Sequence, residues 1–203
     1  MRLEVIENHP QSLKSKKPIL LIHGMWHGAW CWKPKFMPYL EKLGFKAYAL
    51  SLSNHGGSPR RKNMNLLRIS DYVNDVKQVV DSLEDTPVLI GHSMGGFVVQ
   101  KYLEKYQAPG AVLLASVPPF GVLKGTLAVL NAFPGAFLKA NLTLDLKNII
   151  DTPEKFRYLM FSDKVAEEDI AKYLKLIDSE SYLAYMDMLG LNLVKTNKIK
   201  TAL

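Results

Sequence analysis

The sequence predicts an α/β protein: a mostly parallel β-sheet with helices on both faces, followed by a helical segment. Three observations predict this fold. Short apolar runs alternate with helical patterns over residues 1–117, as expected for a parallel sheet. Two of the runs, residues 18–22 and 88–90, are continuously apolar, like strands buried on both faces. Each of these two runs is followed by a turn marked by glycine.

Local signals place the individual elements of this first part. Residues 3–6 alternate apolar and charged side chains, which is typical of an edge strand. Further strands are expected at 18–22, 45–50, 88–90 and 111–115, and helices at 32–43, 70–83 and 94–106. Ser70 is a suitable N-cap for the second helix, with Asp71 in its first turn.

The chain is expected to be helical after Pro118 and Pro119. This expectation rests on three segments: residues 123–138, which are rich in Leu and Phe, a Thr-Pro helix start at Thr152, and a predicted helix at 182–189. The sequence thus predicts a core at 1–117, a helical cap at 118–190 and a return toward the core at 191–203. The apolar residues of 123–138 indicate an apolar pocket, although such helices also occur in cores.

Length, charge and the distribution of basic residues indicate the class of protein and which partners are favoured. A length of 203 residues fits one domain, and the net charge is +7. The basic residues are scattered, with the densest run at 60–62, and no aromatic residues interleave with them. A solvated basic surface is therefore favoured over nucleic-acid binding. No motif indicates a metal or an organic cofactor.

The sequence also predicts where in the cell the protein is located. No run of about 18 apolar residues indicates a membrane span, and acidic residues stand where a signal peptide would be apolar. The single cysteine, Cys31, lies between two tryptophans and is interpreted as a packing residue. One unpaired cysteine suits a reducing cytoplasm, which is the predicted location.

The stretch that points to chemistry is Gly91-His92-Ser93-Met94-Gly95. An apolar strand pattern precedes it and a helical pattern follows it. In this G-x-S-x-G arrangement, a sharp strand-to-helix turn exposes a serine hydroxyl above the sheet. Small residues are needed at both glycines because the turn is tight and other backbone comes close. Ser93 is therefore the candidate nucleophile.

A second glycine turn, His23-Gly24-Met25-Trp26, follows the neighbouring strand. A serine that attacks an ester creates an oxyanion, which needs backbone N–H donors already aimed at it. Met94, at the helix start, is placed to offer one donor and Met25 the other. Trp26 and His27, in the same turn, are candidate substrate-binding residues.

These motifs resemble the α/β-hydrolase superfamily over essentially the whole chain. The resemblance rests on residues 23–24, the loop 54–58, the serine turn 91–96 and the start of the helical segment at 117–119. The run 23–32, HGMWHGAWCW, looks like the esterase and hydroxynitrile-lyase branch, including plant methylesterases. The resemblance implies a serine hydrolase with Ser93 as nucleophile and Met25 and Met94 as oxyanion donors.

The chain departs from the family at the catalytic base and acid. In the superfamily the order is Ser, then Asp or Glu, then His, but all five histidines precede Ser93: His9, His23, His27, His55 and His92. His23, His27 and His55 are interpreted as structural. The aspartates after Ser93 lie in the helical part, where helix caps and solvated faces explain them. We therefore expect neither triad partner in this chain.

From this departure we expect a C-terminally truncated hydrolase, nearly inactive and poorly stable by itself, with strand 111–115 left as an apolar edge. The leading hypothesis is hydrolysis of a small, apolar carboxylic ester or related acyl compound. Lyase chemistry stays open within the superfamily. The alternative hypothesis is a non-catalytic ligand-binding protein or truncated pseudoenzyme of the same fold.

Overall fold

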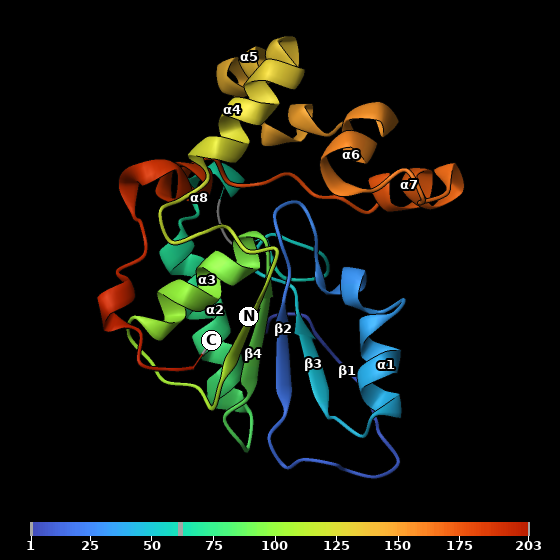
Figure 1. Ribbon diagram of the computed structural model, residues 1–203, viewed down its shortest axis with the longest axis vertical. Helices are drawn as coiled ribbons and strands as arrows, with labels where there is room; N and C mark the ends of the chain where they lie inside the picture. The colour runs from blue at the N-terminus through green and yellow to red at the C-terminus, as the bar shows by residue number, and fades with distance from the viewer. Residues whose placement is uncertain (1, 61–62, 203) are drawn as a thin grey trace.

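A five-stranded sheet forms the centre of the molecule (Figure 1). The computed structural model describes residues 2–60 and 63–202, so Arg61 and Lys62 of the predicted basic run lie outside it. The strands are β1 (Val5–Glu7), β2 (Ile19–Ile22), β3 (Ala47–Leu50), β4 (Val88–His92) and β5 (Ala111–Leu114). They lie in the order β1-β3-β2-β4-β5. Only β1 runs antiparallel to its neighbour, which confirms the mostly parallel sheet.

Helices cover both faces of the sheet because the strands are apolar on both sides. Leu20 and Ile22 of β2 pack with the buried residues of α2 (Ile69–Ser82) and α3 (Met94–Leu103). Ile19 and Leu21 face the opposite way, toward α1 (Phe36–Lys42). Figure 1 accordingly shows α1 on one side of the sheet, with α2 and α3 on the other. Side chains of one strand alternate between faces, so this buried strand serves two cores.

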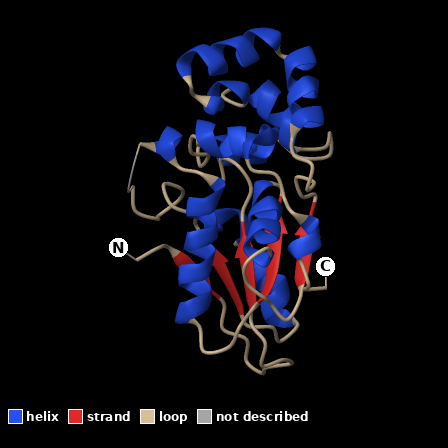
Figure 2. Ribbon diagram, turned by 90° about the vertical axis from the view of Figure 1, so that its left-hand side faces the viewer, coloured by secondary structure: helices blue, strands red, loops and turns tan. Residues whose placement is uncertain are grey.

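A layer of helices lies over one end of the sheet (Figure 2). We call this layer, which spans residues 123–186, the helical layer. Its members are α4 (Leu123–Ala132), α5 (Pro134–Thr143), α6 (Pro153–Met160), α7 (Glu167–Leu174) and α8 (Tyr182–Met186). The Asp178 N–H donates to the carbonyl of Trp26, in the loop after β2. The layer therefore covers the carboxyl ends of the parallel strands.

Several predicted helix boundaries were wrong for identifiable reasons. The helix expected at 32–43 is a 3-10 turn (Ala29–Trp32) followed by α1, with Pro34 between them. The segment 123–138 divides into α4 and α5 because Pro134 starts a new helix. α3 ends at Leu103, three residues earlier than expected.

The N-cap of α2 also differs from the prediction. The helix begins at Ile69, so Ser70 lies inside it. The Asp71 carboxylate instead accepts the Arg68 N–H, at 2.9 Å. A carboxylate at the third helical position thus satisfies the backbone N–H of the observed N-cap residue, Arg68.

Strand register brings the two glycine turns together. Ile22 of β2 lies opposite Gly91 of β4, and Gly91 lies opposite Leu113 of β5. His23 and Ser93 follow soon after these paired residues. Because the strands are parallel, the loops that leave them meet at the same edge of the sheet.

Candidate active site

Ser93 lies at the turn between β4 and α3 with an unusual backbone. Its φ of +52° and ψ of −119° lie outside the regions that a serine prefers. Four hydrogen bonds hold this conformation: the Ser93 N–H donates to Leu114, and the Ser93 carbonyl accepts from Gly96, Phe97 and Val117, all at 3.0–3.3 Å. Backbone strain maintained in this way is typical of functional sites.

The two glycines of the motif are required by close backbone contacts. A Cβ added at Gly91 would lie 2.5 Å from the Gly95 carbonyl oxygen. A Cβ added at Gly95 would lie 2.4 Å from the carbonyl oxygens of Ile22 and His23. These distances leave no room for a side chain, so the reason predicted for the small residues is confirmed.

The Gly24–Met25 turn lies directly against the serine. A Cβ on Gly24 would approach the Ser93 Cβ to 3.0 Å. The Met25 N–H makes no hydrogen bond within the described residues. Met94 is the first residue of α3, so its N–H has no partner inside the helix. Two available backbone donors therefore belong to the residues that flank the serine hydroxyl.

His23 holds the Met25 turn and is not placed as a catalytic base. Its Nδ1–H donates to the Gly24 carbonyl at 2.8 Å, and its Nε2 accepts the Leu52 N–H at 3.0 Å. Both ring nitrogens are thus occupied in the neutral form. Complete burial, reinforced by the nearby charge of His55, holds the pKa of His23 well below its ordinary value.

The imidazoles of His27 and His92 contact groups other than the serine hydroxyl. The Nδ1 of His27 donates to the Met25 carbonyl at 2.7 Å, and its ring stacks on Trp30. The His92 ring meets Trp32 edge-on. Burial lowers the pKa of both His27 and His92. Within the described residues no side chain hydrogen-bonds to the Ser93 hydroxyl.

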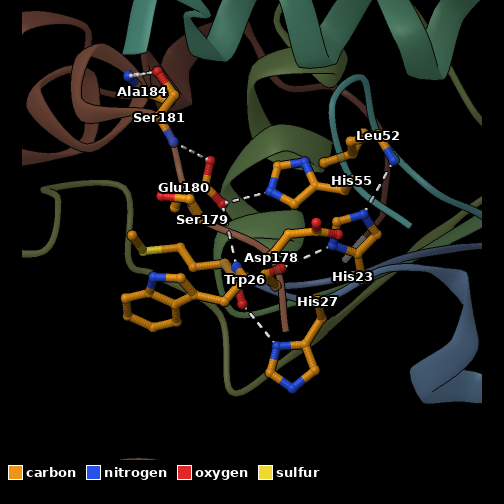
Figure 3. A network of polar contacts seen from close by, with 12 residues as sticks. His23, Trp26, His27, Leu52, His55, Asp178, Ser179, Glu180, Ser181 and Ala184 are labelled. Atoms are coloured by element: carbon orange, nitrogen blue, oxygen red, sulfur yellow. Dashed lines mark hydrogen bonds and ion pairs between the residues drawn. The ribbon is translucent and has the colours of Figure 1, made fainter. Parts of the chain in front are cut away.

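His55 forms a buried ion pair that sequence reasoning missed. Its Nε2 lies 3.2 Å from Glu180 Oε2 (Figure 3). Its Nδ1 donates to the Ser53 carbonyl at 3.0 Å. Burial by itself would lower the pKa of His55, but the Glu180 charge and hydrogen bond, together with the Ser53 carbonyl and the Asp178 charge, outweigh burial and raise it. Glu180 stands between two serines, a polar setting typical of a solvated loop, so no sequence signal marked it as buried.

The aspartates of the helical part are not all caps or solvated residues. Asp145 caps a short 3-10 helix, as predicted. Asp187, in contrast, is fully buried and accepts hydrogen bonds from Arg68 and the Ile69 N–H. That part of the prediction was wrong for Asp187, because its carboxylate joins the segment after α8 to the start of α2.

The match to known proteins decides the family. A family model described as "Alpha/beta hydrolase family" matches residues 19–193. The chain belongs to this family. The match covers all but the first strand and the last ten residues, which includes both glycine turns and the helical layer.

The relatives of this chain include several esterases. It is 36% identical to Salicylic acid-binding protein 2 of Nicotiana tabacum over 114 residues, 54% of this chain and 43% of that protein. It is 36% identical to Methylesterase 2 of Arabidopsis thaliana over 95 residues, 46% of this chain and 36% of that one. The matches therefore span about two fifths of the length of these relatives.

A solved structure shares the fold. Polyneuridine aldehyde esterase superposes with a TM-score of 0.66, covering 90% of this chain and 76% of that one, at 23% identity. At this identity the likeness bears on the fold alone. Together with the family match, it confirms the predicted α/β-hydrolase fold.

A small apolar cavity of about 80 Å³ lies between the hydrolase core and the helical layer. Its lining comes from Met25 and Trp26, from α4 and α5, from the 3-10 helix Leu146–Ile149 and from α8. Among the lining residues are Gly125, Thr126, Val129, Phe137, Leu146, Ile149 and Tyr185. The leucines of α4 and Leu138 were expected to contribute to such a pocket, but they are exposed. Only Phe137 of the expected aromatic residues lines it.

Three further features of the described residues concern the cysteine, membrane-spanning helices and metal-binding clusters. Burial raises the pKa of the Cys31 thiol to about 12, which fits a packing residue. No described helix has the length and apolarity needed to cross a bilayer. Among residues 2–60 and 63–202, no three His, Cys, Asp or Glu side chains are grouped to hold a metal ion.

Proposed function

We propose that this chain carries the nucleophile and the oxyanion hole of a hydrolase that acts on a small carboxylic ester. The strained backbone of Ser93, at the carboxyl end of β4 and against the Gly24–Met25 turn, is the observation that supports this role most directly. Membership of the hydrolase family and the esterase relatives point to the same general class of reaction.

In the proposed reaction, Ser93 Oγ attacks the ester carbonyl carbon and its proton passes to a base. The negative charge that develops on the carbonyl oxygen is bound by the Met25 and Met94 N–H groups. Collapse of the tetrahedral intermediate breaks the ester C–O bond, and the alcohol leaves with a proton. Water then attacks the acyl-serine and releases the acid. Each N–H donor contributes about 3 kcal/mol to the transition state.

The base for the first step is not among the described residues. A serine hydroxyl is a weak nucleophile at neutral pH unless a base accepts its proton. Oxyanion-hole contacts and binding without the triad still give about 10³–10⁴-fold acceleration over water. We therefore propose full turnover only where a histidine and its acid partner are supplied to Ser93.

The apolar cavity beside Met25 supports a small, apolar acyl or alcohol group as the substrate portion bound there. Trp26 lines this cavity. His27 does not line it, and its Nδ1 donates to the Met25 carbonyl. The name of one relative, a methylesterase, fits an ester of a small alcohol. A cytoplasmic location is likewise a proposal, based on the single cysteine.

Hydrolysis of short-chain esters by the protein in its full natural length tests this function. Ser93→Ala is expected to lower kcat/KM by about 10³-fold or more, since the nucleophile is lost. Ser70→Ala, an exposed serine on α2, is the matched control and is expected to leave turnover unchanged. A folded Ser93→Ala variant with unchanged turnover would contradict the proposal. A folded wild type that turns over no ester would favour the non-catalytic ligand-binding alternative.

A further inference from the structure

Glu180 is a fully buried carboxylate that takes no part in the reaction proposed above. It lies in the helical layer between α7 and α8. Its Oε1 accepts the Tyr72 hydroxyl at 2.7 Å and the Ser181 N–H at 2.8 Å. Its Oε2 accepts the His55 imidazole at 3.2 Å and the Trp26 N–H at 3.4 Å (Figure 3). All four partners donate, so an ionised carboxylate satisfies them all.

The contact with Trp26 reaches the turn that carries the proposed oxyanion donor. Trp26 has a φ of +64°, a left-handed conformation that is costly for a large side chain. Its N–H is held by Glu180, and its carbonyl accepts the Asp178 N–H at 2.8 Å. Residues 178–180 of the helical layer therefore hold both polar backbone groups of Trp26.

Two consecutive peptide groups of this turn are fixed by side chains. The Met25–Trp26 peptide is held at its oxygen by His27 and at its N–H by Glu180. The Gly24–Met25 peptide is held at its oxygen by His23. The C=O and N–H of a trans peptide point in opposite directions. Fixing these two planes therefore sets the direction of the Met25 N–H.

We infer that Glu180 is a positioning residue: it links the helical layer to the Met25 turn and keeps the Met25 N–H aimed at the oxyanion. This inference rests on the proposed function for the role of Met25. The part about the turn rests only on the contacts of Glu180 and Trp26. The His55 imidazole contacts one carboxylate oxygen within the core, and the Tyr72 hydroxyl holds the other.

Glu180→Gln is the direct test, because it keeps the shape of the side chain and changes its hydrogen bonding. The amide replaces one acceptor oxygen with an NH₂ donor, which then faces N–H groups that also donate. The matched control is Asp187→Asn. Asp187 is equally buried in the same part of the chain, but it holds Arg68 and the Ile69 N–H, away from the Met25 turn.

Hydrogen–deuterium exchange of the amides of residues 24–28 measures the turn without reference to activity. We expect exchange to rise about 10-fold in Glu180→Gln and to stay within about 2-fold of wild type in Asp187→Asn. In ester hydrolysis, Glu180→Gln should lower kcat about 10-fold with little change in KM, since a displaced donor affects the transition state. Tyr72→Phe, which removes one donor, should give a smaller change in the same direction.

The outcomes separate the two claims. Unchanged exchange in Glu180→Gln, or equal increases in Glu180→Gln and Asp187→Asn, would overturn the positioning role. If Glu180→Gln does not fold, the same comparison between Tyr72→Phe and Asp187→Asn decides. A wild type that hydrolyses no ester would contradict the proposed function, and the exchange result would still decide whether Glu180 holds the turn.

Discussion

At the scale of single residues, the serine turn has a strained backbone at Ser93 and no room for side chains at the glycines around it. Ser93 adopts a left-handed φ, and the glycines on either side let three segments of backbone meet around it. The strain is compensated by the hydrogen bonds of the Ser93 N–H and carbonyl. Stability and function therefore compete at the same few positions.

Gly95→Ala tests this crowding. The added Cβ would lie 2.4 Å from two carbonyl oxygens of the β2 turn, and backbone cannot move aside cheaply. We expect the free energy of unfolding to fall by about 2–3 kcal/mol, measured by urea denaturation. Gly135→Ala in α5 is the control, because open space surrounds that position, and it should be neutral or slightly stabilising. Equal effects of the two variants would contradict the account.

The roles of some residues could be predicted from the sequence, and those of others could not. The small residues at Gly91 and Gly95 follow from local turn geometry, and that reasoning holds. Glu180 could not be found in the same way, because its burial depends on His55 and Tyr72, which lie more than 100 residues away. A carboxylate in a polar stretch gives no local sign of such partners.

At the scale of elements, the helical layer is joined to the core by buried charge. The His55–Glu180 pair connects the loop after β3 to the segment before α8. Asp187 makes a comparable connection to the start of α2. Removing one partner of a buried pair leaves the other charge uncompensated, so the His55–Glu180 contact depends on the proton of His55.

The raised pKa of His55 gives this sensitivity a direction. The folded state holds the His55 proton more tightly than the unfolded state, so the pair stabilises fully below the ordinary value of 6.5. That stability is lost as pH rises from there through the raised pKa. We expect the free energy of unfolding to fall in this range in wild type and to vary less in His55→Gln, as measured by urea denaturation.

A direct titration of the His55 imidazole by NMR checks the same claim. Glu180, Asp178 and the Ser53 carbonyl all favour the proton, while His23 nearby disfavours it. The ring should therefore lose its second proton at a higher pH than a free imidazole does. A neutral His55 ring at pH 6.5 would contradict this account of the layer.

The ends of the helices and the side of each helix that is buried were the features hardest to predict from the sequence. Strongly periodic segments were placed correctly, but Pro34 and Pro134 divided two expected helices. The face of α4 was also misjudged. Leu123, Leu127 and Leu130 are exposed, and the smaller residues Gly125 and Thr126 face the cavity. Apolar composition alone does not indicate which side of a helix is buried.

At the scale of the whole molecule, the fold follows from the alternation of apolar runs and helical patterns. All five expected strands are present, and β5 lies at the edge of the sheet, as expected. The Ala111 N–H of β5 donates to the Ala202 carbonyl. The meeting of the two glycine turns depends on strand order and register, which the sequence does not state.

The central claim is that Ser93 is a nucleophile facing an oxyanion hole. The most direct measurement is covalent labelling of the protein in its full natural length by a fluorophosphonate, with the modified residue mapped by peptide mass spectrometry. The account predicts one label per chain, on Ser93, which is absent in Ser93→Ala and slower when the Met25 turn is loosened by Glu180→Gln. A folded wild type that takes no label, or takes it on another residue, would contradict the claim.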